Sequence, residues 1–213
     1  MQKLIYFLSI LLFINCYKKE NLTYKEMKAD KLLSESFTDY ELNNLAKIVD
    51  FFEDQIYKET KESDIEKRYN EFLKNDSIRL LDKHLLFIFD YKKQEKLYLN
   101  LDSIFFKSFL DVGFGYGANI NEKEYEFYNL KSYDKYGKFL EKLSQKNSYF
   151  KDYYFSTVIV NDFLSTNASY NLITNYKNYN FKDIKIRLLY SLHYIIQNEF
   201  LYKKSTKNHE KIR

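Results

Sequence analysis

The regular spacing of apolar residues is the feature that most constrains the fold of this 213-residue chain. Thr38 is followed three residues later by Glu41, which is the pattern of a capping box at the start of a helix. Beyond it, apolar residues recur every three or four positions, at Leu42, Leu45, Val49, Phe52 and Ile56. Because this spacing places them on one face, the sequence predicts an amphipathic helix here.

A second segment of the same kind lies near the C-terminus and begins at Asp183. Its apolar positions form a wider stripe, made by Ile184, Leu188, Leu189, Leu192, Ile195, Ile196 and Phe200. A wide apolar stripe is typical of a helix that other elements surround. We therefore expect a helix of about five turns at the centre of the fold.

Shorter capped segments occupy much of the chain between these two helices. We expect further helices over residues 63–75, 78–99, 102–110, 121–128, 133–145 and 163–176. Residues 149–160 begin with helical spacing and end in β-branched residues, so a helix and a strand are both compatible with them. The sequence thus predicts a single compact all-α domain of about seven or eight helices. The alternative is an α+β domain with a small β-hairpin formed by residues 85–89 and 97–101.

The composition is that of an ordinary folded domain. Hydrophobic residues make up 45% of the chain and charged residues 30%, which argues against intrinsic disorder. The net charge of +4 comes from 34 basic and 30 acidic residues. Because a nucleic-acid-binding protein is expected to concentrate basic residues on one face, we expect no nucleic-acid partner.

The N-terminus has the organisation of a secretory signal. Lys3 gives it a positive head, and an apolar run from Leu4 to Ile14 is interrupted only by Ser9. Signal peptides have an apolar region of about 7–15 residues, which is too short to cross a bilayer as a helix. We therefore exclude residues 1–15 from the folded domain.

The end of this segment, Phe13-Ile14-Asn15-Cys16, resembles the lipobox of bacterial lipoproteins. The usual lipobox has leucine three residues before the cysteine and a small residue directly before it, where this chain has Phe13 and Asn15. The resemblance covers only the signal segment. It implies cleavage before Cys16, a diacylglycerol on the Cys16 sulfur, and a place in the bacterial cell envelope, on the outer membrane if the cell is Gram-negative. Cys16 is also the only cysteine, so an exported domain would fold without an internal disulfide.

The mature chain divides further by composition. Residues 16–36 are polar and rich in lysine and glutamate, and we expect them to form a lipidated tether. Residues 37–202 contain the predicted helices of the domain. Residues 203–213 are polar and basic, and we expect them to form a flexible tail.

The most distinctive loop predicted is Gly113-Phe114-Gly115-Tyr116-Gly117, which holds three of the four glycines of the chain. A phosphate-binding loop needs a strand before it and a helix after it, and this GxGxG spacing lacks that context and a following Lys-Ser/Thr pair. Two interpretations remain. The loop is either a flexible turn that presents Phe114 and Tyr116 to a partner, or a helix connection whose aromatic side chains cover the core.

The remaining candidates for chemistry are two histidines and the acidic residues of the first long helix. His84 and His193 each stand among apolar residues, which is typical of a hydrogen-bonded core histidine. No metal-ligand spacing such as HExxH surrounds His193. The carboxylates at positions 50, 53, 54 and 59 fit a solvated helix face better than paired acid–base catalysis. We therefore expect no metal, cofactor or catalytic residue.

Three classes of function follow from these patterns. The first is a membrane-anchored lipoprotein whose helical domain binds another protein without catalysis, as a surface adhesin, an envelope component or an immunity-type protein does. The second is a periplasmic binder of a small ligand, and the third is an envelope hydrolase. We favour the first because the sequence combines an anchor signal and a helical body with no evident catalytic constellation.

Overall fold

The computed structural model describes residues 21–81, 89–116, 123–160 and 166–211. These residues form ten α-helices and one two-stranded antiparallel sheet. The prediction of an all-α fold is confirmed, with helices that are more numerous than expected. The hairpin in the described part lies at residues 110–130, whereas residues 97–100 of the alternative prediction belong to a helix.

Two short helices, α2 (Leu22–Ala29) and α3 (Lys31–Ser36), occupy most of the segment that we expected to be a tether. The side chains of Asn21 and Asp30 cap them by accepting hydrogen bonds from backbone N–H groups. Met27 and Leu33 are completely buried, so these helices belong to the folded domain. The tether prediction is therefore wrong from Leu22 onward, because a few apolar residues in this polar segment pack into the core.

The helix α4 (Asp39–Thr60) starts with the predicted capping box. The Thr38 backbone N–H donates to Glu41 Oε2 at 2.8 Å, and the Glu41 N–H donates to Thr38 Oγ1 at 3.3 Å. The next helix, α5 (Ile65–Leu81), continues past the predicted end near residue 75. It does so because Asp76, expected at a turn, is buried and accepts a hydrogen bond from the Tyr194 hydroxyl at 2.6 Å.

Two further helices, α6 (Tyr91–Asn100) and α7 (Ser103–Phe109), lead into the hairpin and are capped by Asp90 and Asp102. The strands β1 (Leu110–Tyr116) and β2 (Lys123–Leu130) pair from Leu110 opposite Leu130, with a bulge after Gly115. The prediction of a helix over residues 121–128 is wrong, because residues 123–128 form this strand.

The segment after the hairpin is helical and irregular. It comprises α8 (Lys135–Lys146), η1 (Ser148–Phe150), α9 (Lys151–Tyr154), a π-helical turn η2 (Phe155–Ile159), α10 (Thr166–Thr174) and η3 (Tyr176–Asn178). The helix predicted over 133–145 is confirmed. Residues 149–160, for which the sequence left the type open, are helical as far as Ile159.

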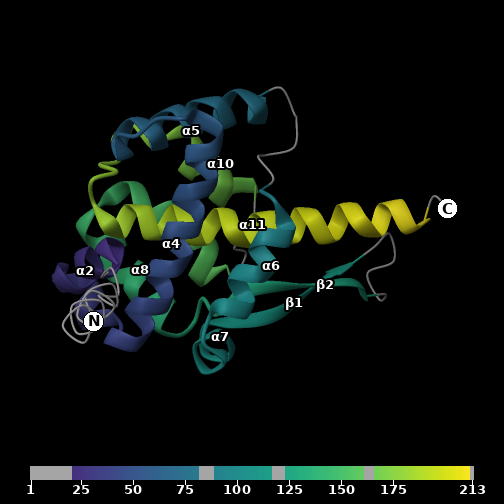
Figure 1. Ribbon diagram of the computed structural model, residues 1–213, viewed down its shortest axis with the longest axis horizontal. Helices are drawn as coiled ribbons and strands as arrows, with labels where there is room; N and C mark the ends of the chain where they lie inside the picture. Colours follow the sequence, from purple (N-terminus) through teal and green to yellow (C-terminus); the bar gives the residue numbers. More distant parts are fainter. Residues whose placement is uncertain (1–20, 82–88, 117–122, 161–165, 212–213) are drawn as a thin grey trace, which may run out of the picture.

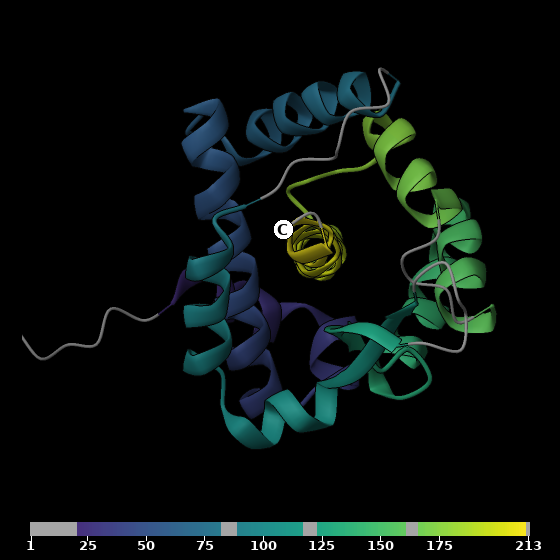
Figure 2. The ribbon, with the colours of Figure 1, turned by 90° about the vertical axis from the view of Figure 1, so that its right-hand side faces the viewer.

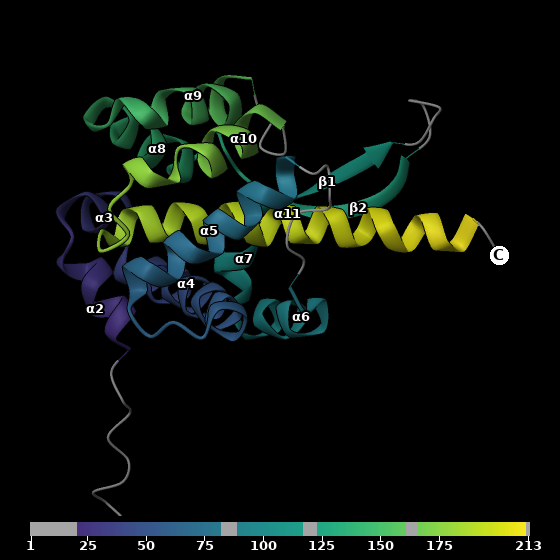
Figure 3. The ribbon, with the colours of Figure 1, turned by 90° about the horizontal axis from the view of Figure 1, so that it is seen from above.

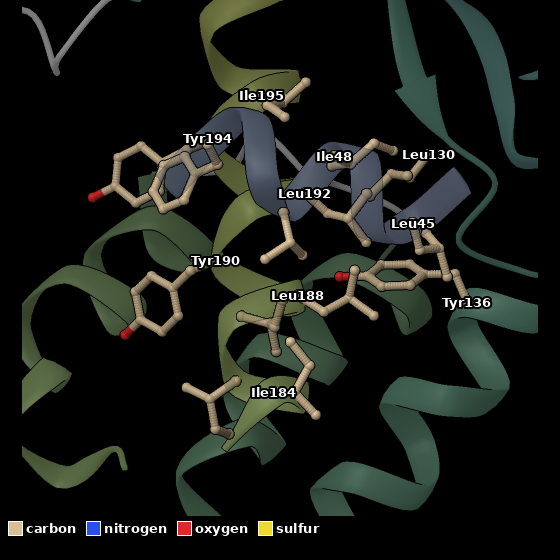
Figure 4. Close-up of a cluster of buried hydrophobic side chains, with 14 of the residues drawn as sticks. Leu45, Ile48, Leu130, Tyr136, Ile184, Leu188, Tyr190, Leu192, Tyr194 and Ile195 are labelled. Carbon is tan, nitrogen blue, oxygen red and sulfur yellow. The ribbon is translucent and has the colours of Figure 1, made fainter. Parts of the chain in front are cut away.

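The last helix, α11 (Ile184–Lys211), is the centre of the domain. Figure 2, which looks along α11, shows the other elements arranged around it. Its side chains from Leu188 to Ile196 are almost entirely buried, and several of them meet Leu45 and Ile48 of α4 and Tyr136 of α8 in the core (Figure 4). The helix continues through Lys211, so residues 203–211 are part of it and not the separate tail that we expected.

The two ends of α11 lie in different surroundings. Near its start, Arg187 pairs with Glu26 of α2 at 2.5 Å and with Glu53 of α4 at 3.1 Å, and Lys185 pairs with Asp30 at 2.5 Å. These ion pairs attach α2 and α3 to one end of the molecule. The hairpin lies beside the C-terminal half of α11 at the opposite end (Figures 1 and 3).

Candidate functional site

The predicted interaction loop lies where the hairpin meets the end of α11. Buried amides attach α6 to the same stretch of α11: Gln94 Nε2 donates to the Ile195 carbonyl at 3.0 Å, and Asn198 Nδ2 donates to Gln94 Oε1 at 2.8 Å. We call β1, β2 and residues 198–206 of α11 the hairpin arm. It projects with the C-terminus beyond the helical body (Figure 1).

Gly113 and Gly115 are strand residues, which corrects the expectation of a flexible loop at positions 113–116. Gly113 lies opposite Phe127, and Gly115 lies opposite Tyr125. A Cβ at Gly113 would lie 2.7 Å from Phe127 Cζ, and a Cβ at Gly115 would lie 2.1 Å from Tyr125 Cζ. The glycines are therefore needed because the two aromatic rings fold across them. They do not act as hinges.

The same two rings attach the hairpin to α11. The Phe127 ring centroid lies 5.2 Å from that of Phe200, and the Tyr125 centroid lies 5.9 Å from it. The Lys204 ammonium lies 5.7 Å from the Phe200 ring centroid. Aromatic pairs at these distances are favourable. The packing thus fixes the position of β1 and β2 along α11.

A second aromatic cluster attaches the hairpin to α6 and α7. The Tyr128 ring lies 4.7 Å from Phe106 and 5.4 Å from Tyr98. Large apolar side chains in this part of the molecule are nevertheless exposed to solvent. Their exposed fractions are 84% for Leu99, 73% for Ile104 and 44% for Val112.

The five residues of the predicted loop do not share one role in the structure. Phe114 is half-buried and lies opposite Glu126, so it is not the fully exposed tip that one interpretation required. Tyr116 pairs through its backbone with Lys123. Gly117 lies outside the described residues. Gly113 and Gly115 have the packing role given above.

A cavity of about 130 Å³ opens between the hairpin and α11. It is lined by Val112, Glu126, Phe127, Tyr128, Glu199 and Lys203. The Glu199 side chain is completely buried. Burial raises the pKa of its carboxyl group, and this effect outweighs the opposing effects of the Tyr91 hydroxyl and the Lys203 ammonium.

Glu199 is not among the residues predicted from the sequence, although a signal for it is present. Glu199 follows Ile195 and Ile196 by four and three residues, so it stands on the apolar stripe of the central helix. A carboxylate on a buried stripe is unusual and indicates a functional or structural requirement. Its proximity to β2 was not predictable, because that segment was expected to be a helix.

His193 is a core residue. It is completely buried, its Nδ1 lies 3.3 Å from the Tyr153 hydroxyl, and its Nε2 lies 3.2 Å from Ser169 Oγ. Burial lowers the pKa of His193 to about 3, so the ring is neutral at physiological pH. The cavity of the hairpin arm is not lined by His193. The arrangement therefore fits a structural histidine, as its apolar surroundings in the sequence predict.

Two carboxylates of α4 make contacts with other helices, whereas a solvated helix face was expected. Asp50 accepts hydrogen bonds from Asn21 Nδ2 and Thr23 Oγ1, both at 2.5 Å. Glu53 pairs with Arg187, and burial raises the pKa of Glu53 to about 6. These contacts connect α2, α4 and α11. They give Asp50 and Glu53 structural contacts.

Other candidates lie elsewhere or outside the described residues. Cys16 and His84 belong to ranges whose placement is not described. A separate group of exposed apolar side chains lies on η2, its end and α10, with exposed fractions of 50–58%: Phe155, Ile159, Val160 and Tyr170. This group borders residues 161–165, which also lie outside the described ranges.

In comparisons with known proteins, no family model, curated protein or solved structure matches this chain. Within the described ranges, no three histidine, cysteine or acidic side chains gather as a metal site would require. None of the helices in those ranges is both long and apolar enough to span a bilayer.

Proposed function

We propose that this chain is a lipid-anchored protein of the bacterial cell envelope whose helical domain binds another protein without catalysis. The anchor rests on the signal segment and its resemblance to a lipobox at Cys16. The class includes surface adhesins, envelope components and immunity-type proteins. In each of them the folded domain works by presenting a surface on the outside of a membrane.

The observation that carries this proposal is the distance between the anchor and the start of the fold. Asn21 caps α2, so only five Cα–Cα steps separate it from Cys16. A chain of that length spans at most about 18 Å. A lipid on Cys16 would therefore hold the α2 end of the domain close to the membrane surface.

The hairpin arm lies at the other end of the molecule from α2 (Figures 1 and 3). An anchored domain would thus direct the arm away from the membrane, where a partner has access to it. Exposed apolar side chains such as Leu99, Ile104 and Val112 are of the kind that protein interfaces bury. A hydrolase is less well supported, because His193 is sealed in the core.

Intact mass spectrometry of the membrane-extracted protein tests the anchor. The proposal predicts a mature chain that begins at Cys16 and carries added acyl mass. The Cys16→Ala variant should lack that mass and leave the membrane fraction. A wild-type chain that begins elsewhere and carries no lipid would contradict the proposal.

A further inference from the structure

Glu199 is a buried carboxylate without a completed hydrogen bond. Its side chain has no exposed surface, and the Tyr91 hydroxyl, the Tyr128 backbone and the Lys203 ammonium lie close enough to lower its pKa. Even so, neither Oε1 nor Oε2 of Glu199 makes a hydrogen bond of normal length and angle with the described residues. A carboxylate that is removed from water without a partner is costly to the fold, so one in a native structure calls for an explanation.

The basic residue in the cavity lining does not form an ion pair with Glu199. Lys203 lines the same cavity, and its ammonium lies 5.3 Å from the centroid of the Tyr91 ring. None of the ion pairs among the described residues involves Lys203 or Glu199. The carboxylate therefore remains available to a cation that enters from outside.

The size and lining of the cavity restrict what that cation is. A volume of about 130 Å³ is smaller than the roughly 300 Å³ typical of drug-sized ligand pockets and close to the ~150 Å³ that holds one benzene molecule. Two carboxylates, Glu126 and Glu199, and the rings of Phe127 and Tyr128 line it. Carboxylates with aromatic faces are the usual surroundings of a bound guanidinium or ammonium group.

We propose that the cavity of the hairpin arm binds the guanidinium or ammonium group of an arginine or lysine side chain from the partner protein, with Glu199 as its buried counter-ion. That the cation belongs to a protein rests on the proposed function. The recognition of the cation rests only on the cavity and its residues. Lys203 opposes the entry of a second positive charge, so it limits the affinity of the site.

Ligand-observed NMR with N-acetylarginine amide as the probe tests this inference on the full mature chain. N-acetylcitrulline amide has nearly the same shape without the charge and serves as the neutral control. We expect the arginine probe to bind, the citrulline probe not to bind, and Glu199→Gln to weaken binding of the arginine probe at least about tenfold. Glu141→Gln, on the exposed surface of α8, is the matched control and should leave binding unchanged.

Lys203→Met separates the proposed cation site from an anion site. If the cavity is a cation site, this variant should bind the arginine probe more tightly. If the cavity is instead an anion site built around Lys203, wild type should bind acetate and this variant should not. Equal binding of the two amide probes, or equal affinity of wild type and Glu199→Gln, would overturn the inference. These binding measurements do not depend on whether Cys16 carries a lipid. Failure of the anchor proposal and failure of the cation-site proposal can therefore be told apart.

Discussion

At the scale of single residues, the interior of this protein contains ionisable groups whose pKa values are shifted by burial. His193 is kept neutral between Tyr153 and Ser169, and Glu199 is kept from water beside the hairpin. The sequence predicted the first of these, because a lone histidine among apolar residues is typical of a core. It did not predict the second, because the surroundings of Glu199 come from β2, which is distant in sequence.

The buried His193 has a measurable effect on the pH dependence of stability. Its pKa in the folded chain is about 3, against 6.5 for an exposed histidine, so the unfolded chain binds a proton that the folded chain does not. The contribution of His193 to stability is present above pH 6.5 and is lost as the pH falls towards 3. The expected slope is up to about 1.4 kcal/mol per pH unit in that window.

Urea unfolding of wild type and His193→Phe at several pH values measures this effect. The variant should lose about 1–3 kcal/mol at pH near 7.5, because Tyr153 and Ser169 lose a partner. Below pH 6.5 its stability should fall less steeply than that of wild type, because position 193 no longer takes up a proton. Parallel pH profiles for the two proteins would show that His193 is not buried in its neutral form.

At the scale of elements, helices were predictable and the hairpin was not. The three- and four-residue spacing of apolar residues is local to each helix, so α4, α8 and α11 follow from local sequence, and α4 also has its capping box. Asn121 and Glu124 imitate a helix cap, which led to the wrong prediction for β2. The pairing of Gly113 and Gly115 with aromatic residues on the opposite strand is visible only once the two strands are placed together.

The glycines of β1 provide a direct test of this packing. Gly115→Ala should destabilise the domain by about 1–3 kcal/mol, because the new methyl group would overlap the Tyr125 ring. Asp111→Ala is the matched control, since position 111 is exposed on the same strand and should have little effect. Thermal unfolding gives both values.

A double variant distinguishes steric overlap from a general loss of strand stability. In Gly115→Ala with Tyr125→Ala, the two costs should be less than additive, because removal of the ring leaves space for the methyl group. Strict additivity would contradict the packing of Tyr125 across Gly115.

At the scale of the whole molecule, α11 connects two ends of the domain that differ in structure. With 28 residues it is about 42 Å long. Ion pairs of Arg187 and Lys185 hold α2 and α3 near its start, and the hairpin arm lies along its C-terminal half. The sequence predicted a central C-terminal helix but placed a loose tether before the domain. The folded α2 and α3 make the connection to Cys16 short, and this gives an anchored molecule a preferred orientation.

Site-specific photo-crosslinking in the cells that naturally produce the protein tests the central claim most directly. A photoreactive phenylalanine analogue replaces Val112 on the hairpin arm, Phe155 on η2, or Leu22 at the α2 end, all of which are exposed. The account predicts a discrete protein adduct from position 112 and none from positions 155 and 22. An adduct from position 155 alone would place the contact surface on η2, and the absence of any adduct from position 112 would contradict the account.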